Sequence, residues 1–111
     1  MTFQRLLAQA VVTDLSVAER WYAVVFDGPP HDRPMDGLLE WHLGASFGVQ
    51  VWLDPERAGR SAMVVEESDL DTLTDRLSAA AVEHDGPQPG GGARVLILTD
   101  PDGNQVVFTG A

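Results

Sequence analysis

The sequence predicts an α+β fold in which one strand–helix–strands unit occurs twice, with the helices packed on one face of the sheet. The first observation behind this prediction is an internal repeat. VVTDLSVAERWYAVVFDG, starting at Val11, and VVEESDLDTLTDRLSAAAVEHDG, starting at Val64, each begin with a valine pair, pass through acidic residues into a helical pattern, and end in Asp-Gly. The second observation is the order of the elements, because strand-like runs flank a helical pattern in both halves.

Two helices are expected. The first spans about Ser16–Phe26, because Ser16 and Glu19 have the spacing of a capping box and apolar residues then recur on one side. The second spans about Asp69–Val82, with Ser68 as its cap and a stripe of leucines on its buried side.

Strands are expected where apolar and polar residues alternate. These runs are Phe3–Val12, Leu38–Leu43, Phe47–Leu53, Ala62–Glu66, Arg94–Leu98 and Gln105–Thr109. The segments Gly28–Gly37 and Gly86–Ala93 are rich in proline and glycine and are predicted to be loops. On the first strand the even-numbered residues are apolar and suit packing under a helix, whereas the odd-numbered residues are mixed, as on a ligand-facing surface.

Composition narrows the possible functions. The chain has 111 residues, about the size of one domain, and it contains no cysteine, which excludes disulfides, thiolate nucleophiles and cysteine-ligated metal sites. Its formal charge of −10 disfavours nucleic acid and anionic membrane surfaces as partners. Neither a signal peptide nor a membrane-spanning apolar run is recognised, so a cytoplasmic location is expected.

Three motifs occur in an informative order: Val12-Thr13-Asp14 before the first helix, the aromatic pair Trp21-Tyr22 within it, and Asp-Pro-Asp-Gly-Asn at residues 100–104 before the last strand. With the repeat, they resemble the vicinal oxygen chelate superfamily, which includes glyoxalase I, extradiol dioxygenases and bleomycin-resistance proteins. The resemblance implies a single domain over residues 1–111, with βαβββ modules over about 1–56 and 57–111. It also implies a curved mixed sheet around a cavity, helices on the outer face, and a homodimer.

Enzymes of this superfamily hold a divalent metal with His, Glu or Gln side chains from four strands. The resemblance places the first ligand position at Leu7, the last at Val107, and the one opening the second module at Arg60 or Ala62. None of these side chains offers a lone pair to a metal. The remaining position falls in the strand GLLEWHLG, at Glu40 or His42. One ligand does not make a site, so no metal cofactor is expected.

The candidate ligand-binding residues are those expected to face the cavity. Val107, in the orientation of the family's glutamate, would bring Gln105 to the same side. Trp41 and Trp52 flank a predicted hairpin, and their indoles would either grip a flat or cationic guest or pack in the core or a dimer interface. The full set is Leu7, Gln9, Trp41, His42, Gln50, Trp52, Gln105 and Val107.

The leading hypothesis is a metal-independent small-molecule-binding protein, comparable in kind to the bleomycin-resistance proteins, that sequesters a cationic or aromatic compound. The alternative is a metal-dependent lyase or dioxygenase-like enzyme with a displaced metal site, in which His42 and Glu40 act as catalytic residues. For a lone histidine such as His42, the favoured interpretation is an imidazole whose hydrogen bonds are satisfied by a neighbour. A third possibility is that the fold serves only as a dimerising module.

Overall fold

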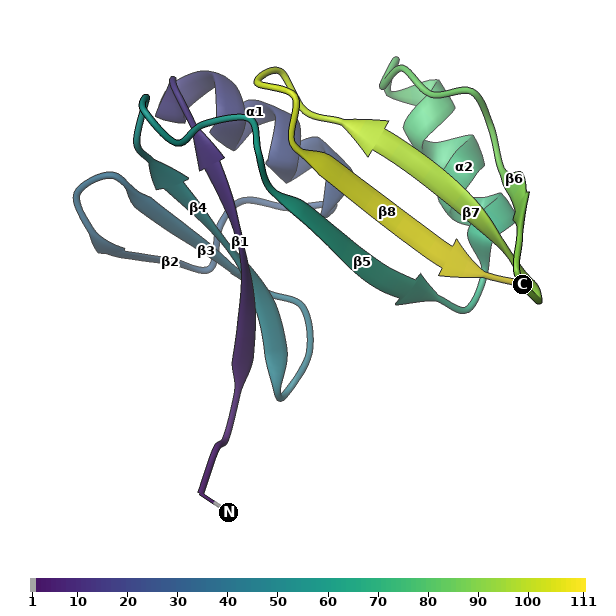
Figure 1. Cartoon of the computed structure of the whole chain (residues 1–111), viewed down its shortest axis with the longest axis horizontal. Helices are drawn as coiled ribbons and strands as arrows, with labels where there is room; N and C mark the ends of the chain where they lie inside the picture. The colour runs from purple at the N-terminus through teal and green to yellow at the C-terminus, as the bar shows by residue number, and fades with distance from the viewer. Residues whose placement is uncertain (1) are drawn as a thin grey trace.

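The computed structural model describes residues 2–111 and arranges them in two four-stranded sheets, each packed against one helix (Figure 1). The first half contains β1 Leu6–Val12, α1 Leu15–Val25, β2 Asp32–Met35, β3 Leu38–His42 and β4 Phe47–Leu53. The second half contains β5 Ala62–Glu67, α2 Leu70–Ala79, β6 Gln88–Gly90, β7 Ala93–Thr99 and β8 Gln105–Gly110. Among residues 2–111, neither helix has the length and apolar character needed to span a bilayer.

The two sheets have the same topology, which confirms the predicted α+β class and its βαβββ repeat. The strand orders are β1-β4-β3-β2 and β5-β8-β7-β6. In each half the first strand pairs in parallel with the last, and the other neighbours are antiparallel. A parallel pair needs a long crossover between its strands, and the helix supplies part of it. Both helices lie behind the strands in Figure 1, so the opposite side of each sheet carries no helix.

The helix caps differ from the predicted ones. Asp14, not Ser16, caps α1 by accepting a hydrogen bond from the Val17 amide at 3.0 Å. Asp69, not Ser68, caps α2 in the same way. Serine and aspartate both serve as caps, so a run that contains both leaves the choice to the path of the chain.

Two short strands were missed. β2 and β6 lie in the segments predicted to be loops, and each contains a proline, Pro34 or Pro89. Both are the outermost strands of their sheets, where a residue without a backbone N–H is tolerated. The proline and glycine content of these segments therefore predicts a loop where each half has an edge strand.

The helix-facing sides of the sheets form the core. In the first half, the fully buried Trp41 packs against Tyr22 of α1 and against Phe26, the C-terminal cap of that helix. The ring centroids of these two residues lie 6.1 and 5.9 Å from that of Trp41. Its indole N–H donates to the carbonyl of Gly28 at 2.9 Å, so the one polar atom of the ring is satisfied. In the second half the leucines of α2 are buried against β7 and β8.

The turn before β8 fastens the two halves together. Asn104 is fully buried, and its side-chain amide donates to the Val11 carbonyl at 2.8 Å, while its oxygen accepts from the Ser61 amide at 2.9 Å. Asn104 also donates to the buried carboxylate of Asp100 at 2.8 Å. That carboxylate accepts a second hydrogen bond, at 2.7 Å, from the hydroxyl of Tyr22. Burial, and then the bond to Asp100, raise the pKa of Tyr22.

Candidate ligand-binding face

The side of the first sheet opposite α1, called the open face below, is a grid of three rows across β1, β4 and β3. The backbone register aligns Gln9, Gln50 and Glu40 in the middle row. The row on one side is Val11, Trp52 and Leu38, and the row on the other is Leu7, Gly48 and His42. A polar row is thus flanked by an apolar row and by a mixed one.

Hydrogen bonds connect the polar side chains of this face into one chain. Gln9 Nε2 donates to Gln50 Oε1 at 3.2 Å, and Gln50 Nε2 donates to Glu40 Oε2 at 2.7 Å. The other carboxylate oxygen, Glu40 Oε1, lies 2.9 Å from His42 Nε2. Both oxygens of Glu40 are therefore partnered, one by an amide and one by an imidazole.

Glu40 is a buried anion. Its residue is only 5% exposed. The hydrogen bond from His42 and then the one from Gln50 lower the pKa of the Glu40 carboxyl, with a smaller contribution from the charge of Arg5, and burial opposes them. The carboxyl group is therefore ionised at neutral pH, as predicted for a carboxylate that receives two hydrogen bonds.

His31, which lies in the proline-rich segment predicted to be a loop, joins this cluster. Its ring stacks on that of His42, with centroids 5.6 Å apart and planes 12° from parallel. His31 Nδ1 accepts a hydrogen bond from the His42 backbone amide at 3.1 Å, and the His31 amide donates to the Glu40 carbonyl at 2.8 Å. The contact was hidden because it depends on β2 and the segment leading into it, which proline content marked as a loop.

The predicted ligand-binding residues separate into three places. Five lie on the open face of the first sheet: Leu7, Gln9, His42, Gln50 and Trp52. Gln105 and Val107 share a face of the second sheet, where the register places Val107 between Val64, 69% exposed, and Ile97, 45% exposed. Trp41 belongs to neither set, since it is fully buried under α1, and the expectation that it faces a ligand is corrected.

The four positions that the resemblance assigns to metal ligands can be located in the structure. Asp14 and Asp69 are equivalent caps, so counting back from them pairs Leu7 with Ala62 rather than with Arg60. Ala62 pairs with Gln105 across the parallel strands, and Leu7 pairs with Gly48. Val107 lies two residues after Gln105, so its counterpart in the first half lies two residues after Gly48.

That counterpart is Gln50, on β4, and not Glu40 or His42, which lie on β3. The prediction failed because the sequence does not reveal which later strand pairs with β1. Of the four positions, only Gln50 carries a donor atom, and its amide is already hydrogen-bonded at both ends. These four side chains do not fit a divalent metal. Within residues 2–111 no group of three or more His, Asp or Glu side chains is arranged to hold one elsewhere.

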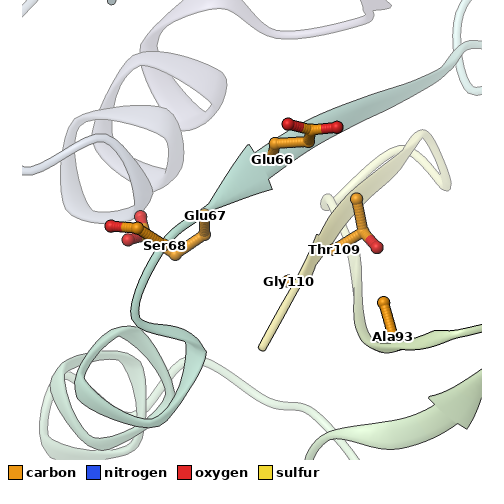
Figure 2. Close-up of a pocket in the computed structure, with 6 residues that line it drawn as sticks. All are labelled: Glu66, Glu67, Ser68, Ala93, Thr109 and Gly110. Atoms are coloured by element: carbon orange, nitrogen blue, oxygen red, sulfur yellow. The ribbon is translucent and has the colours of Figure 1, made fainter.

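A pocket of about 530 Å³ lies at the edge of the second sheet where β5 and β8 end and β7 begins (Figure 2). Its acidic lining suggests a cation site, but the carboxylates of Glu66 and Glu67 leave β5 in different directions in Figure 2. Glu67 Oε1 accepts a hydrogen bond from the Asp69 amide at 3.0 Å, which ties it to the start of α2. The two carboxylates therefore do not converge on a common point.

Comparisons with known proteins place this geometry in context. The chain aligns with "The crystal structure of glyoxalase / bleomycin resistance protein" from Catenulispora acidiphila at a TM-score of 0.89 and 26% identity, covering 96% of this chain and 97% of the other. It aligns with TnmS3, an antibiotic-binding protein from a Streptomyces species, at a TM-score of 0.81 and 23% identity, covering 99% and 98%. A bleomycin-binding protein in complex with bleomycin aligns at a TM-score of 0.80 and 14% identity, covering 96% and 98%.

Curated protein sequences give no significant match. At the sequence level, the profile of one superfamily matches residues 6–108, which is nearly the whole chain. The repeated βαβββ topology and the solved structures agree with that match. The chain therefore belongs to the Glyoxalase/Bleomycin resistance protein/Dioxygenase superfamily.

Proposed function

We propose that this protein binds an organic small molecule on the open face of its first sheet, without using a metal. The observation that carries the proposal is the hydrogen-bonded row Gln9–Gln50–Glu40, with Trp52 on one side and His42 on the other. A few polar groups set among apolar and aromatic surface are the usual make-up of a small-molecule site. The unsuitable side chains at the inherited metal positions support binding without a metal.

The chemistry of the face favours an aromatic or cationic guest. Trp52 is partly exposed there and offers an indole for stacking or for a cation–π contact. Glu40 supplies a buried negative charge, and the formal charge of −10 attracts cations to the molecule as a whole. The antibiotic-binding and bleomycin-binding structures of the same fold are consistent with this class of ligand.

Tryptophan fluorescence tests the proposal. A screen of basic antibiotics and aromatic metabolites, with and without a chelator, should find compounds that change the emission and bind equally in both conditions. Trp52→Phe should abolish the change in emission, whereas the matched variant Trp21→Phe, on α1 behind the sheet, should retain it. A response that needs added metal, or one that survives Trp52→Phe and is lost in Trp21→Phe, would overturn the proposal.

We also propose that the protein forms a homodimer. Phe3 and Leu6 are 87% and 78% exposed on the N-terminal segment, which projects from the rest of the molecule in Figure 1. An apolar pocket of about 480 Å³ lies between β1 and β5, and its lining includes Leu6, Phe47 and Val64. Exposed apolar groups gathered in this way are typical of association surfaces. A second copy would bury these apolar groups.

Sedimentation measurements test the dimer. The wild-type protein should sediment as a dimer at micromolar concentration, and the double variant Leu6→Asp/Val64→Asp should sediment as a monomer. Met35→Asp introduces the same charge at a residue that is 56% exposed on the outer strand β2, and it should leave the dimer intact. A monomeric wild type would refute this part of the proposal.

The contact between Glu40 and His42 favours one alternative, a metal-dependent lyase or dioxygenase-like enzyme. Such a site would need at least one further protein ligand, and residues 2–111 place no third His, Asp or Glu to complete it. Elemental analysis of protein purified without chelators separates the two functions, since stoichiometric divalent metal would favour the enzyme.

A further inference from the structure

We propose that Glu40 sets the hydrogen-bond polarity of the open face, so that Gln9 presents its side-chain oxygen to the guest and the face selects guests that carry an N–H or O–H donor. The inference rests on the proposed function, because it concerns the same face. It adds the kind of hydrogen-bonding group that the guest must offer beside its ring. It also makes Glu40 a positioning residue, which acts on the guest through two glutamines.

The polarity begins at Glu40. A side-chain amide can turn either its nitrogen or its oxygen toward a neighbour, whereas an ionised carboxylate only accepts hydrogen bonds. The atom of Gln50 that faces Glu40 Oε2 at 2.7 Å is therefore the amide nitrogen, Nε2. The other carboxylate oxygen is occupied by His42 Nε2 at 2.9 Å. Glu40 thus decides which way the amide of Gln50 faces.

The orientation of Gln50 is passed on to Gln9. With its nitrogen held by Glu40, Gln50 points Oε1 toward β1, where it accepts a hydrogen bond from Gln9 Nε2 at 3.2 Å. The opposite orientation of Gln9 would set two amide oxygens against each other and would lose this bond. All hydrogen bonds of the row between β1 and β3 therefore run in one direction, from Gln9 to Glu40.

An unpaired acceptor remains at the β1 end of the row. Among residues 2–111, Gln9 Oε1 has no hydrogen-bond partner, and Gln9 is exposed on the outermost strand of the first sheet. Trp52 lies one row further along the neighbouring strand β4, which puts its Cα atom about 8 Å from that of Gln9 by ordinary strand geometry. A flat guest that stacks on the Trp52 indole can therefore bring a group on its own edge to Gln9 Oε1.

The consequence is selection between neutral groups on the guest. A guest with an N–H or O–H at this edge replaces water at Gln9 Oε1 and leaves the row intact. A guest that offers only an acceptor must either rotate the Gln9 amide, which breaks the bond to Gln50, or leave the oxygen without a donor. One neutral hydrogen bond of this kind changes affinity by about three- to tenfold. This selection needs no charge on the guest.

Indole and benzofuran are suitable probes, because both are flat and uncharged and they differ only in an N–H that is replaced by an oxygen atom. Binding is followed in isotope-labelled protein through the NMR signals of the Trp52 indole and of the glutamine side-chain amides. The quantity compared is the ratio of the indole affinity to the benzofuran affinity in each variant. Comparing this ratio between variants cancels the different hydration of the two probes.

Three variants make the test specific. Gln9→Met removes the acceptor and keeps the length of the side chain, so its affinity ratio should be about three- to tenfold lower than that of the wild type. Glu40→Gln introduces an amide that can face Gln50 with either atom, and it should lower the ratio in the same direction. Gln88→Met, at an exposed glutamine of the second half, should keep the wild-type ratio. A general loosening of the fold would weaken both probes alike and leave the ratio unchanged.

The wild type also allows a test of the orientation that does not depend on any variant. Because Gln50 donates to a buried carboxylate, its side-chain amide protons should exchange with water more slowly than those of the exposed Gln88. Equal exchange rates would refute a fixed orientation of Gln50, whether or not Glu40→Gln folds.

The outcomes separate this inference from the proposed function. If the affinity ratio is the same in the wild type and in Gln9→Met, the selection is refuted while small-molecule binding stands. If the ratio falls in Gln9→Met but not in a folded Glu40→Gln, the positioning role of Glu40 is refuted. If neither probe perturbs the Trp52 signal, the inference is refuted and the proposed function also loses its support for aromatic guests.

Discussion

Replacing Asn104 by alanine should remove a large part of the stability of the fold. The change deletes three hydrogen bonds from a fully buried side chain, to the Val11 carbonyl, the Ser61 amide and the Asp100 carboxylate. Neutral hydrogen bonds contribute about 1 kcal/mol each and one to a charged group about 1.5–3 kcal/mol, so the expected loss is about 3–5 kcal/mol. Small domains are stable by only about 5–15 kcal/mol in total.

Urea denaturation followed by circular dichroism measures this loss, at one fixed protein concentration because association would shift the midpoint. Gln88→Ala is the matched control. Its side-chain amide also donates two hydrogen bonds, to the carbonyls of Asp85 and Gly86, but it is exposed, so a change within about 0.5 kcal/mol is expected. Equal losses for the two variants, or a loss below about 1 kcal/mol for Asn104→Ala, would show that the buried turn does not fasten the halves.

Three further predictions follow from other buried groups. Tyr22 is the only tyrosine in the chain, and because its pKa is raised, the stability linked to it is present below the ordinary tyrosine value of about 10 and is lost at higher pH. Tyrosinate absorbance should therefore appear only as the protein unfolds. Tyr22→Phe should lower the free energy of unfolding by about 1.5–3 kcal/mol, because it removes the hydrogen bond to Asp100. Because the pKa of Glu40 is lowered, its contribution to the stability of the fold is present above the ordinary glutamate value of about 4.3 and is lost as the pH falls through the folded-state pKa. Glu40→Gln should therefore make the denaturation midpoint less dependent on acid pH. Trp41→Ala should cost about 3–5 kcal/mol by leaving a cavity in the core, and acrylamide should quench Trp52 more readily than Trp41 in single-tryptophan variants.

Much of the fold could be predicted because its signals are local. The helical periodicity, the acidic residues at the helix starts and the alternating strands each depend on a few neighbouring residues. The repeat then supplied the order of elements in both halves, and the structure confirms it. The caps were misplaced by one or two residues, since neighbouring serine and aspartate carry similar signals. β2 and β6 were missed because their composition resembles that of a loop.

The candidate site was less predictable because it depends on register. Trp41 pairs with Val49 and Trp52 pairs with Leu38, which puts the two indoles on opposite sides of the sheet. The length of the turn between β3 and β4 decides this, and shifting the pairing by one residue would reverse every side chain. The same limit misplaced the fourth inherited metal position. The stacking of His31 on His42 joins a loop to a strand and had no periodic signal.

The prolines of the outer strands have a consequence for assembly. Pro34 in β2 and Pro89 in β6 each remove a backbone donor from the rim of a sheet, which discourages an additional strand from joining there. The other two rims, β1 and β5, carry no proline and lie next to each other near the middle of the molecule. Pairing with a further strand is therefore disfavoured at both outer margins, where successive copies could otherwise add to one another and form a polymer.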